Sequence, residues 1–77
     1  KPNLLEIEIR PGQVYLKRTP QTFAELREKL TALAALDTGY TVVVKTSVLA
    51  QTRELVDVLD MCKDLGLDQL SLMTLKD

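Results

Sequence analysis

The spacing of apolar residues alternates between two periods along this 77-residue chain, and this limits the possible folds more than any other feature. Near the amino end, Leu5, Ile7 and Ile9 alternate with charged residues, which is the pattern of a strand with one buried face. Two later stretches instead repeat their apolar residues every three or four positions, as amphipathic helices do. Both periods in one short chain predict a sheet covered by helices.

Turn and capping residues divide the chain into elements. Pro11 and Gly12 occupy the central positions of a turn, which predicts a type II turn and a hairpin over residues 4–17. Residues 18–20 are expected to be a break. Thr22 and Glu25 then form the pattern of a capping box, so a helix is expected from about residue 23 to 36.

The second half of the chain predicts three further elements. A run of β-branched and aromatic residues at 40–44 indicates a strand in the interior of the sheet. Helical spacing then indicates a second helix from about residue 51 to 65, ended by Gly66. In the last strand, Leu70 and Leu72 alternate with Ser71, so we expect Leu72 to lie in the core beside Leu70.

These elements predict an α+β fold in the order β-β-α-β-α-β, as a single domain over residues 1–77. If the parallel connections are right-handed, both helices pack on one face of a small four-stranded mixed sheet. The other face would lack a cover and would be partly apolar, leaving it or a free strand edge for a second chain. Its candidate apolar residues are Leu4, Tyr15, Val43, Met73 and Leu75.

Composition excludes several classes of function. Ten basic and eleven acidic residues give a net charge of -1, which argues against binding nucleic acid or an anionic membrane. A chain with no His and one Cys cannot build a usual zinc site, a Ser-His triad or an internal disulfide. No apolar stretch approaches the ~20 residues of a membrane helix. We therefore expect no enzyme, no metal and no cofactor.

The remaining candidates for chemistry have structural explanations that we favour. Cys62 lies on the apolar stripe of the second helix, which predicts a buried, inert thiol. The acidic residues of that helix are expected to form a solvated face and not a metal site, and Glu6 and Glu8 to face solvent and not to form a catalytic pair. Hydroxyls near its start are expected to cap it and not to bind phosphate. The acidic residues are Asp57, Asp60 and Asp64, and the residues with hydroxyls are Thr46, Ser47 and Thr52.

Several strings, taken in order, resemble the periplasmic domain of the ExbD/TolR biopolymer-transport proteins. The second half carries most of the likeness, in Val42-Val43-Val44-Lys45, Leu55 to Asp60, Lys63 to Gly66, and Gln69 to Thr74. The first half contributes Ile7, Ile9, the Gly12 turn, Val14-Tyr15-Leu16 and Pro20. The chain departs from the family by having Thr46-Ser47 in place of Ala-Asp and Thr52 in place of an aromatic residue, while Asp60 occupies the matching acidic position.

The resemblance implies a subunit of an inner-membrane motor that converts proton flow into movement in the periplasm. An upstream membrane helix, which carries the proton-binding Asp of the family, would contact an ExbB/TolQ-like channel protein. The domain itself would form a homodimer and bind a TonB/TolA-like protein or peptidoglycan, with strand addition as the expected mode. We expect the partner-binding residues to be Leu4, Val14, Tyr15, Ser47, Asp60, Leu72 and Met73.

One hypothesis from another class stays open at this point. A small-molecule-binding regulatory βαβ domain would need a ligand loop after its first strand, and Arg10-Pro11-Gly12 is a faint version of such a loop. The residues do not choose among iron-complex and vitamin uptake, outer-membrane maintenance, or a gliding or secretion motor.

Overall fold

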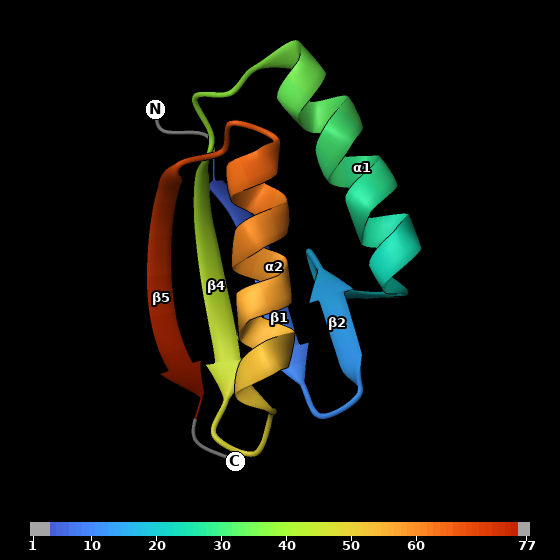
Figure 1. Ribbon diagram of the computed structural model, residues 1–77, viewed down its shortest axis with the longest axis vertical. Coiled ribbons are helices and arrows are strands. Elements are labelled where there is room, and N and C mark those ends of the chain that lie inside the picture. Colours follow the sequence, from blue (N-terminus) through green and yellow to red (C-terminus); the bar gives the residue numbers. More distant parts are fainter. Residues whose placement is uncertain (1–3, 76–77) are drawn as a thin grey trace.

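The chain forms one mixed sheet with two helices, as seen in the computed structural model, which describes residues 4–75 (Figure 1). Within these residues the sheet has five strands in the order β3-β2-β1-β4-β5. Strands β1, β4 and β5 are parallel, and the hairpins join β1, β2 and β3 in antiparallel fashion. The elements are β1 (Leu4–Arg10), β2 (Gln13–Leu16), β3 (Thr19–Gln21), α1 (Phe23–Leu36), β4 (Thr41–Ser47), α2 (Thr52–Asp64) and β5 (Gln69–Leu75).

The structure confirms the α+β class and the two helices, but the expectation of four strands is wrong. The additional strand, β3, lies where we expected only a break before the first helix. It pairs with β2 through a two-residue turn in which Lys17 and Arg18 have φ angles of 50° and 71°. Residues other than Gly, Asn and Asp rarely adopt this left-handed backbone conformation. Because the turn contains neither Asn nor Gly, the sequence gives no usual signal for a hairpin here.

The core lies between one face of the sheet and both helices. Alternate residues of β1 and β4 have no exposed surface, and α1 and α2 each contribute buried residues against them. In Figure 1, α2 lies in front of β1 and β4, while α1 lies toward the β2 side of the sheet. The residues without exposed surface include Leu5, Ile7, Ile9, Val42, Val44, Leu26, Leu30, Val58 and Cys62.

Local sequence signals explain where the helices begin and end. The Thr22 hydroxyl accepts from the N–H of Glu25 at 3.1 Å, and the Thr22 N–H donates to the Glu25 carboxylate at 2.8 Å, which is the predicted capping box. Helix α2 ends at a Schellman motif, because Gly66 has a φ of 80° and the N–H of Leu67 donates to the Cys62 carbonyl at 2.9 Å. These contacts define the start of α1 and the end of α2.

Strand β5 is the least covered part of the helix-facing side. Leu72 pairs in register with the buried Val44, so it lies on the face that carries the helices, as its alternation predicts. It is nevertheless 56% exposed, because α2 lies over β1 and β4 and does not extend over β5 (Figure 1). The prediction that Leu72 belongs to the core is therefore wrong.

Candidate partner-binding edge

Strand β5 forms a free edge of the sheet. It is seven residues long, contains no Pro and no charged residue, and stands last in the strand order, where β4 is its neighbour. An edge strand of this kind presents a row of unpaired backbone N–H and C=O groups. The usual protections of an edge, which are proline, inward charge and short length, are all missing here.

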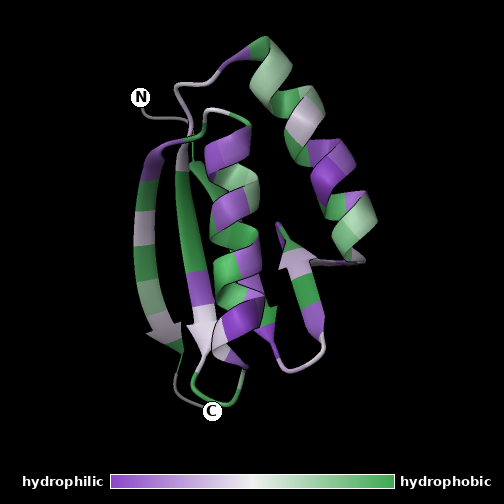
Figure 2. Ribbon diagram, in the orientation of Figure 1, coloured by the Kyte–Doolittle hydropathy of each residue, from purple (hydrophilic) through white to green (hydrophobic). Residues whose placement is uncertain are grey.

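Apolar side chains surround this edge on both faces of the sheet. Leu72 faces the helix side and Met73, which is 51% exposed, faces the other side. Val56 of α2 is also exposed, and it is not among the residues that line the groove between α1 and α2. Figure 2 shows β5 as a mostly apolar strand outside α2. The edge therefore combines free backbone groups with apolar side chains that an added strand could cover.

The opposite edge of the sheet is protected. Strand β3 has three residues, and the middle one is Pro20, which pairs in register with Tyr15 and has no N–H to donate. A strand that short, with a donor missing at its centre, cannot support a continuous ladder with another chain. The two edges therefore differ, and β5 is the one suited to strand addition.

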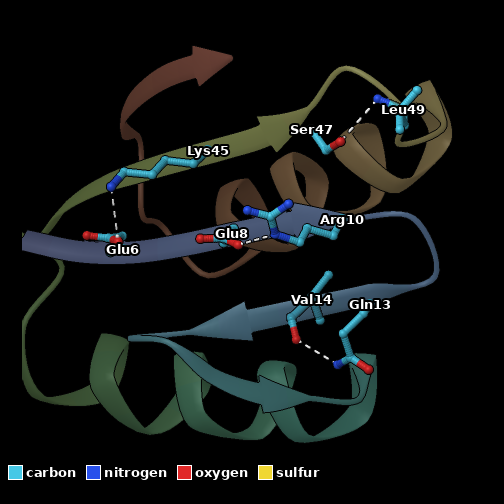
Figure 3. A network of polar contacts seen from close by, with 8 residues as sticks. All are labelled: Glu6, Glu8, Arg10, Gln13, Val14, Lys45, Ser47 and Leu49. Atoms are coloured by element: carbon cyan, nitrogen blue, oxygen red, sulfur yellow. Dashed lines mark hydrogen bonds and ion pairs between the residues drawn. The ribbon is translucent and has the colours of Figure 1, made fainter. Parts of the chain in front are cut away.

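The uncovered face of the sheet is charged at its centre. Lys45 Nζ of β4 lies 3.1 Å from Glu6 Oε1 of β1, and Arg10 contacts Glu8 along β1 (Figure 3). Pairs this accessible to water contribute little to stability, but they make the middle of the face polar. Of the apolar residues that we expected on this face, Leu4, Met73 and Leu75 lie toward its margins, whereas Tyr15 and Val43 lie beside the charged residues, in register with Glu8 and Glu6.

Cys62 is buried on α2, whereas three aspartates of the same helix are exposed. Burial raises the pKa of the Cys62 thiol to about 11, so the thiol is protonated at neutral pH, and the expectation of a buried cysteine is confirmed. Asp57, Asp60 and Asp64 are exposed along an open groove between α1 and α2. Among residues 4–75, no group of three or more Cys, Asp or Glu side chains is placed to hold a metal ion.

The sequence profile of the family described as "Biopolymer transport protein ExbD/TolR" matches residues 1–77 of the chain. The chain belongs to the ExbD/TolR family. Members of this family are energy-transduction subunits of biopolymer transport, associated with the inner membrane and carrying a periplasmic domain. No curated protein sequence matches the chain closely enough to add a more specific assignment. Neither helix in the described part of this domain is long and apolar enough to cross a membrane.

We expected seven partner-binding residues from the sequence, and in the structure they lie in several different places. Leu72 and Met73 lie together on β5. Leu4 and Tyr15 lie on the uncovered face, and Asp60 lies in the groove between the helices. Val14 and Ser47 are only 2% and 3% exposed, so their side chains are enclosed by this domain and are not available at its surface. The Ser47 hydroxyl instead accepts from the N–H of Leu49 at 3.1 Å.

Glu54 has a positioning role that the sequence analysis missed. Its carboxylate accepts from the N–H of Gln51 at 3.0 Å and from the N–H of Gly12 at 3.0 Å, which ties the β1–β2 turn to the start of α2. The spacing of Gln51 and Glu54 is a sequence signal for the first contact, but nothing local indicates the second. Because the Gly12 N–H already donates to Glu54, this N–H in the turn after β1 is not free to bind a ligand. This weakens the alternative of a small-molecule-binding regulatory domain.

Proposed function

We propose that this ExbD/TolR domain is the periplasmic end of a motor subunit driven by the proton-motive force. In this role it forms a homodimer and binds an extended segment of a TonB-like or TolA-like protein by strand addition at β5. The observation that carries the proposal is the contrast between the two edges of the sheet. Strand β5 is long, uncharged and free of proline, whereas β3 is short and interrupted by Pro20.

Strand addition suits the chemistry of this edge. Backbone hydrogen bonds would supply most of the affinity, and alternate side chains of the segment would contact Leu72 on one face and Met73 on the other. Because those contacts are apolar and few, they would set the register of the segment and would not recognise individual charges. A free force-transmitting segment could in this way be held firmly while it keeps an extended form.

The other partners implied by the family fit around this edge. An ExbB/TolQ-like channel protein would contact the membrane helix of the subunit and not this domain. Peptidoglycan is the alternative ligand in the periplasm, but a glycan does not need a row of free backbone groups on a strand. The β5 edge therefore favours a peptide.

The proposal can be tested by titrating the domain with a synthetic peptide from the periplasmic segment of the TonB-like or TolA-like protein of the same organism. Amide chemical shifts should change most along β5, with smaller changes on β4. Two variants, Ser71→Pro and Leu72→Pro, each remove one backbone N–H of β5. Because neighbouring N–H groups of a strand point in opposite directions, one of these two groups points toward β4 and the other toward the free edge. The variant that loses the outward N–H should keep the native spectrum, and it should abolish peptide binding.

Asp60→Ala provides the matched control, since Asp60 is exposed on the groove side of α2. It should leave peptide affinity within about fivefold, because an exposed charge contributes less than about 1 kcal/mol. Shift changes confined to α1 and α2, with the β5 amides unmoved, would defeat strand addition. A folded proline variant that binds as tightly as the parent would also defeat it.

A further inference from the structure

A second concave surface lies at the opposite side of the domain from β5. Helix α1 and the β2–β3 hairpin enclose a groove of about 380 Å³. Its apolar lining includes Leu16, Ala32 and Leu33, and its polar lining includes Lys17, Lys29 and Thr19. Gln21 also lines it, and an apolar hollow with a few polar groups is the usual composition of a binding site.

The charge of this groove is one-sided. Both ionisable residues of its lining are lysines, and no carboxylate lines it. Within residues 4–75, neither Lys17 nor Lys29 forms an ion pair, although the domain as a whole has slightly more acidic than basic residues. Two unpaired ammonium groups beside an apolar floor are complementary to a ligand that joins an apolar group to carboxylates.

The backbone holds one of these lysines in a fixed position. Lys17 occupies the left-handed region with a φ of 50°, and its N–H donates to the Glu6 carbonyl at 3.0 Å. A side chain carried by such a turn starts from a defined direction, which lowers the entropy lost when it binds an anion. The conformation is unfavourable for Lys, and strained residues of this kind concentrate at functional sites.

We propose that this groove binds an acidic segment of a partner protein, with an apolar side chain seated on Leu16 and Leu33 and flanking carboxylates paired with Lys17 and Lys29. A protein segment is favoured over a free amphiphile because the groove is open to solvent and can receive a side chain from a chain lying across it. Strand addition does not operate here, since Pro20 interrupts the neighbouring edge. The site is thus separate from β5 and goes beyond the function proposed above.

The probe for this test is the peptide Ac-Glu-Leu-Leu-Glu-NH₂, with Ac-Gln-Leu-Leu-Gln-NH₂ and Ac-Lys-Leu-Leu-Lys-NH₂ as controls. The acidic peptide should shift the amides of Leu16, Thr19, Ala32 and Leu33, and added salt should weaken its binding. The double variant Lys17→Asn with Lys29→Gln should bind it about tenfold more weakly, through the loss of two charge pairs. Asn tolerates the left-handed backbone at position 17, so the turn should stay intact.

The double variant Arg53→Gln with Lys63→Gln is the matched control, because it removes the same charge from exposed positions on α2, outside the groove. It should bind the acidic peptide as the parent does. Equal binding of the three peptides, or an unchanged affinity in the Lys17 and Lys29 variant, would overturn the proposal. Decanoate that shifts the same amides while the acidic peptide does not would overturn it in favour of a free amphiphile. None of these three outcomes affects the β5 test.

Discussion

Cys62 shows how burial alone determines the chemistry of a residue in this domain. The thiol has no exposed surface, and desolvation of the thiolate raises its pKa from 9.0 to about 11. Because the folded state retains the proton that the unfolded chain loses, the thiol stabilises the fold fully below about pH 9 and progressively less up to about pH 11. The native domain therefore contains almost no reactive thiolate at neutral pH.

This difference in pKa predicts a measurable alkaline loss of stability. The free energy of unfolding should fall by up to about 2 to 3 kcal/mol between pH 9 and pH 11 through this group, since one pKa unit corresponds to about 1.4 kcal/mol. Cys62→Val keeps an apolar group of similar size and should remove this component. Urea unfolding of both proteins across that range measures it. Parallel stability curves for the parent and the variant would contradict the assignment.

At the level of elements, local signals predicted most of the fold. Thr22 and Glu25 predicted the start of α1, and Gly66 predicted the end of α2, because caps depend on residues that are close in sequence. Strand β3 was missed because no local sequence signal marks its turn. Its turn uses Lys17 and Arg18, which carry no local signal for a left-handed conformation, and pairing with β2 outweighs that unfavourable backbone.

The candidate site was predictable only in part. Alternation correctly placed Leu72 and Met73 on opposite faces of the last strand. Their exposure depends on the position of β5 at the end of the sheet and on the reach of α2, and both are properties of the whole packing arrangement. The burial of Val14 and Ser47 is equally non-local, because it requires knowing which side of the sheet the helices cover and how the chain turns after β4.

The exposure of Leu72 predicts a small effect on the stability of the monomer. Leu72→Ala should lower the free energy of unfolding by less than about 1 kcal/mol, because the Leu72 side chain is already largely exposed and buries little apolar surface on folding. Leu67→Ala is the matched comparison, since Leu67 is fully buried and its truncation should cost about 2 to 5 kcal/mol. Thermal unfolding in dilute solution measures both. Equal losses would mean that β5 is covered in the isolated domain.

The whole molecule has one edge suited to pairing and two proposed uses for it. A small domain buries a limited core, so covering Leu72 and Met73 would add useful apolar burial. Two copies related by a twofold axis could pair their β5 strands in antiparallel fashion, which would join the two sheets and use both free edges. The same pairing would then exclude a partner segment from β5. Dimerisation and strand addition should therefore compete.

This competition gives the last prediction. Light scattering of the domain at rising concentration should show a shift from monomer to a symmetric homodimer, and the TonB-like or TolA-like peptide should return it to a one-to-one complex. Leu72→Asp should weaken the dimer, because burying a charge in a paired edge is unfavourable, whereas Asp60→Asn on α2 should not. A mass that stays monomeric at every concentration would remove dimerisation by the isolated domain. A dimer that binds the peptide without dissociating would show that the two contacts use different surfaces, and it would place the dimer interface away from β5.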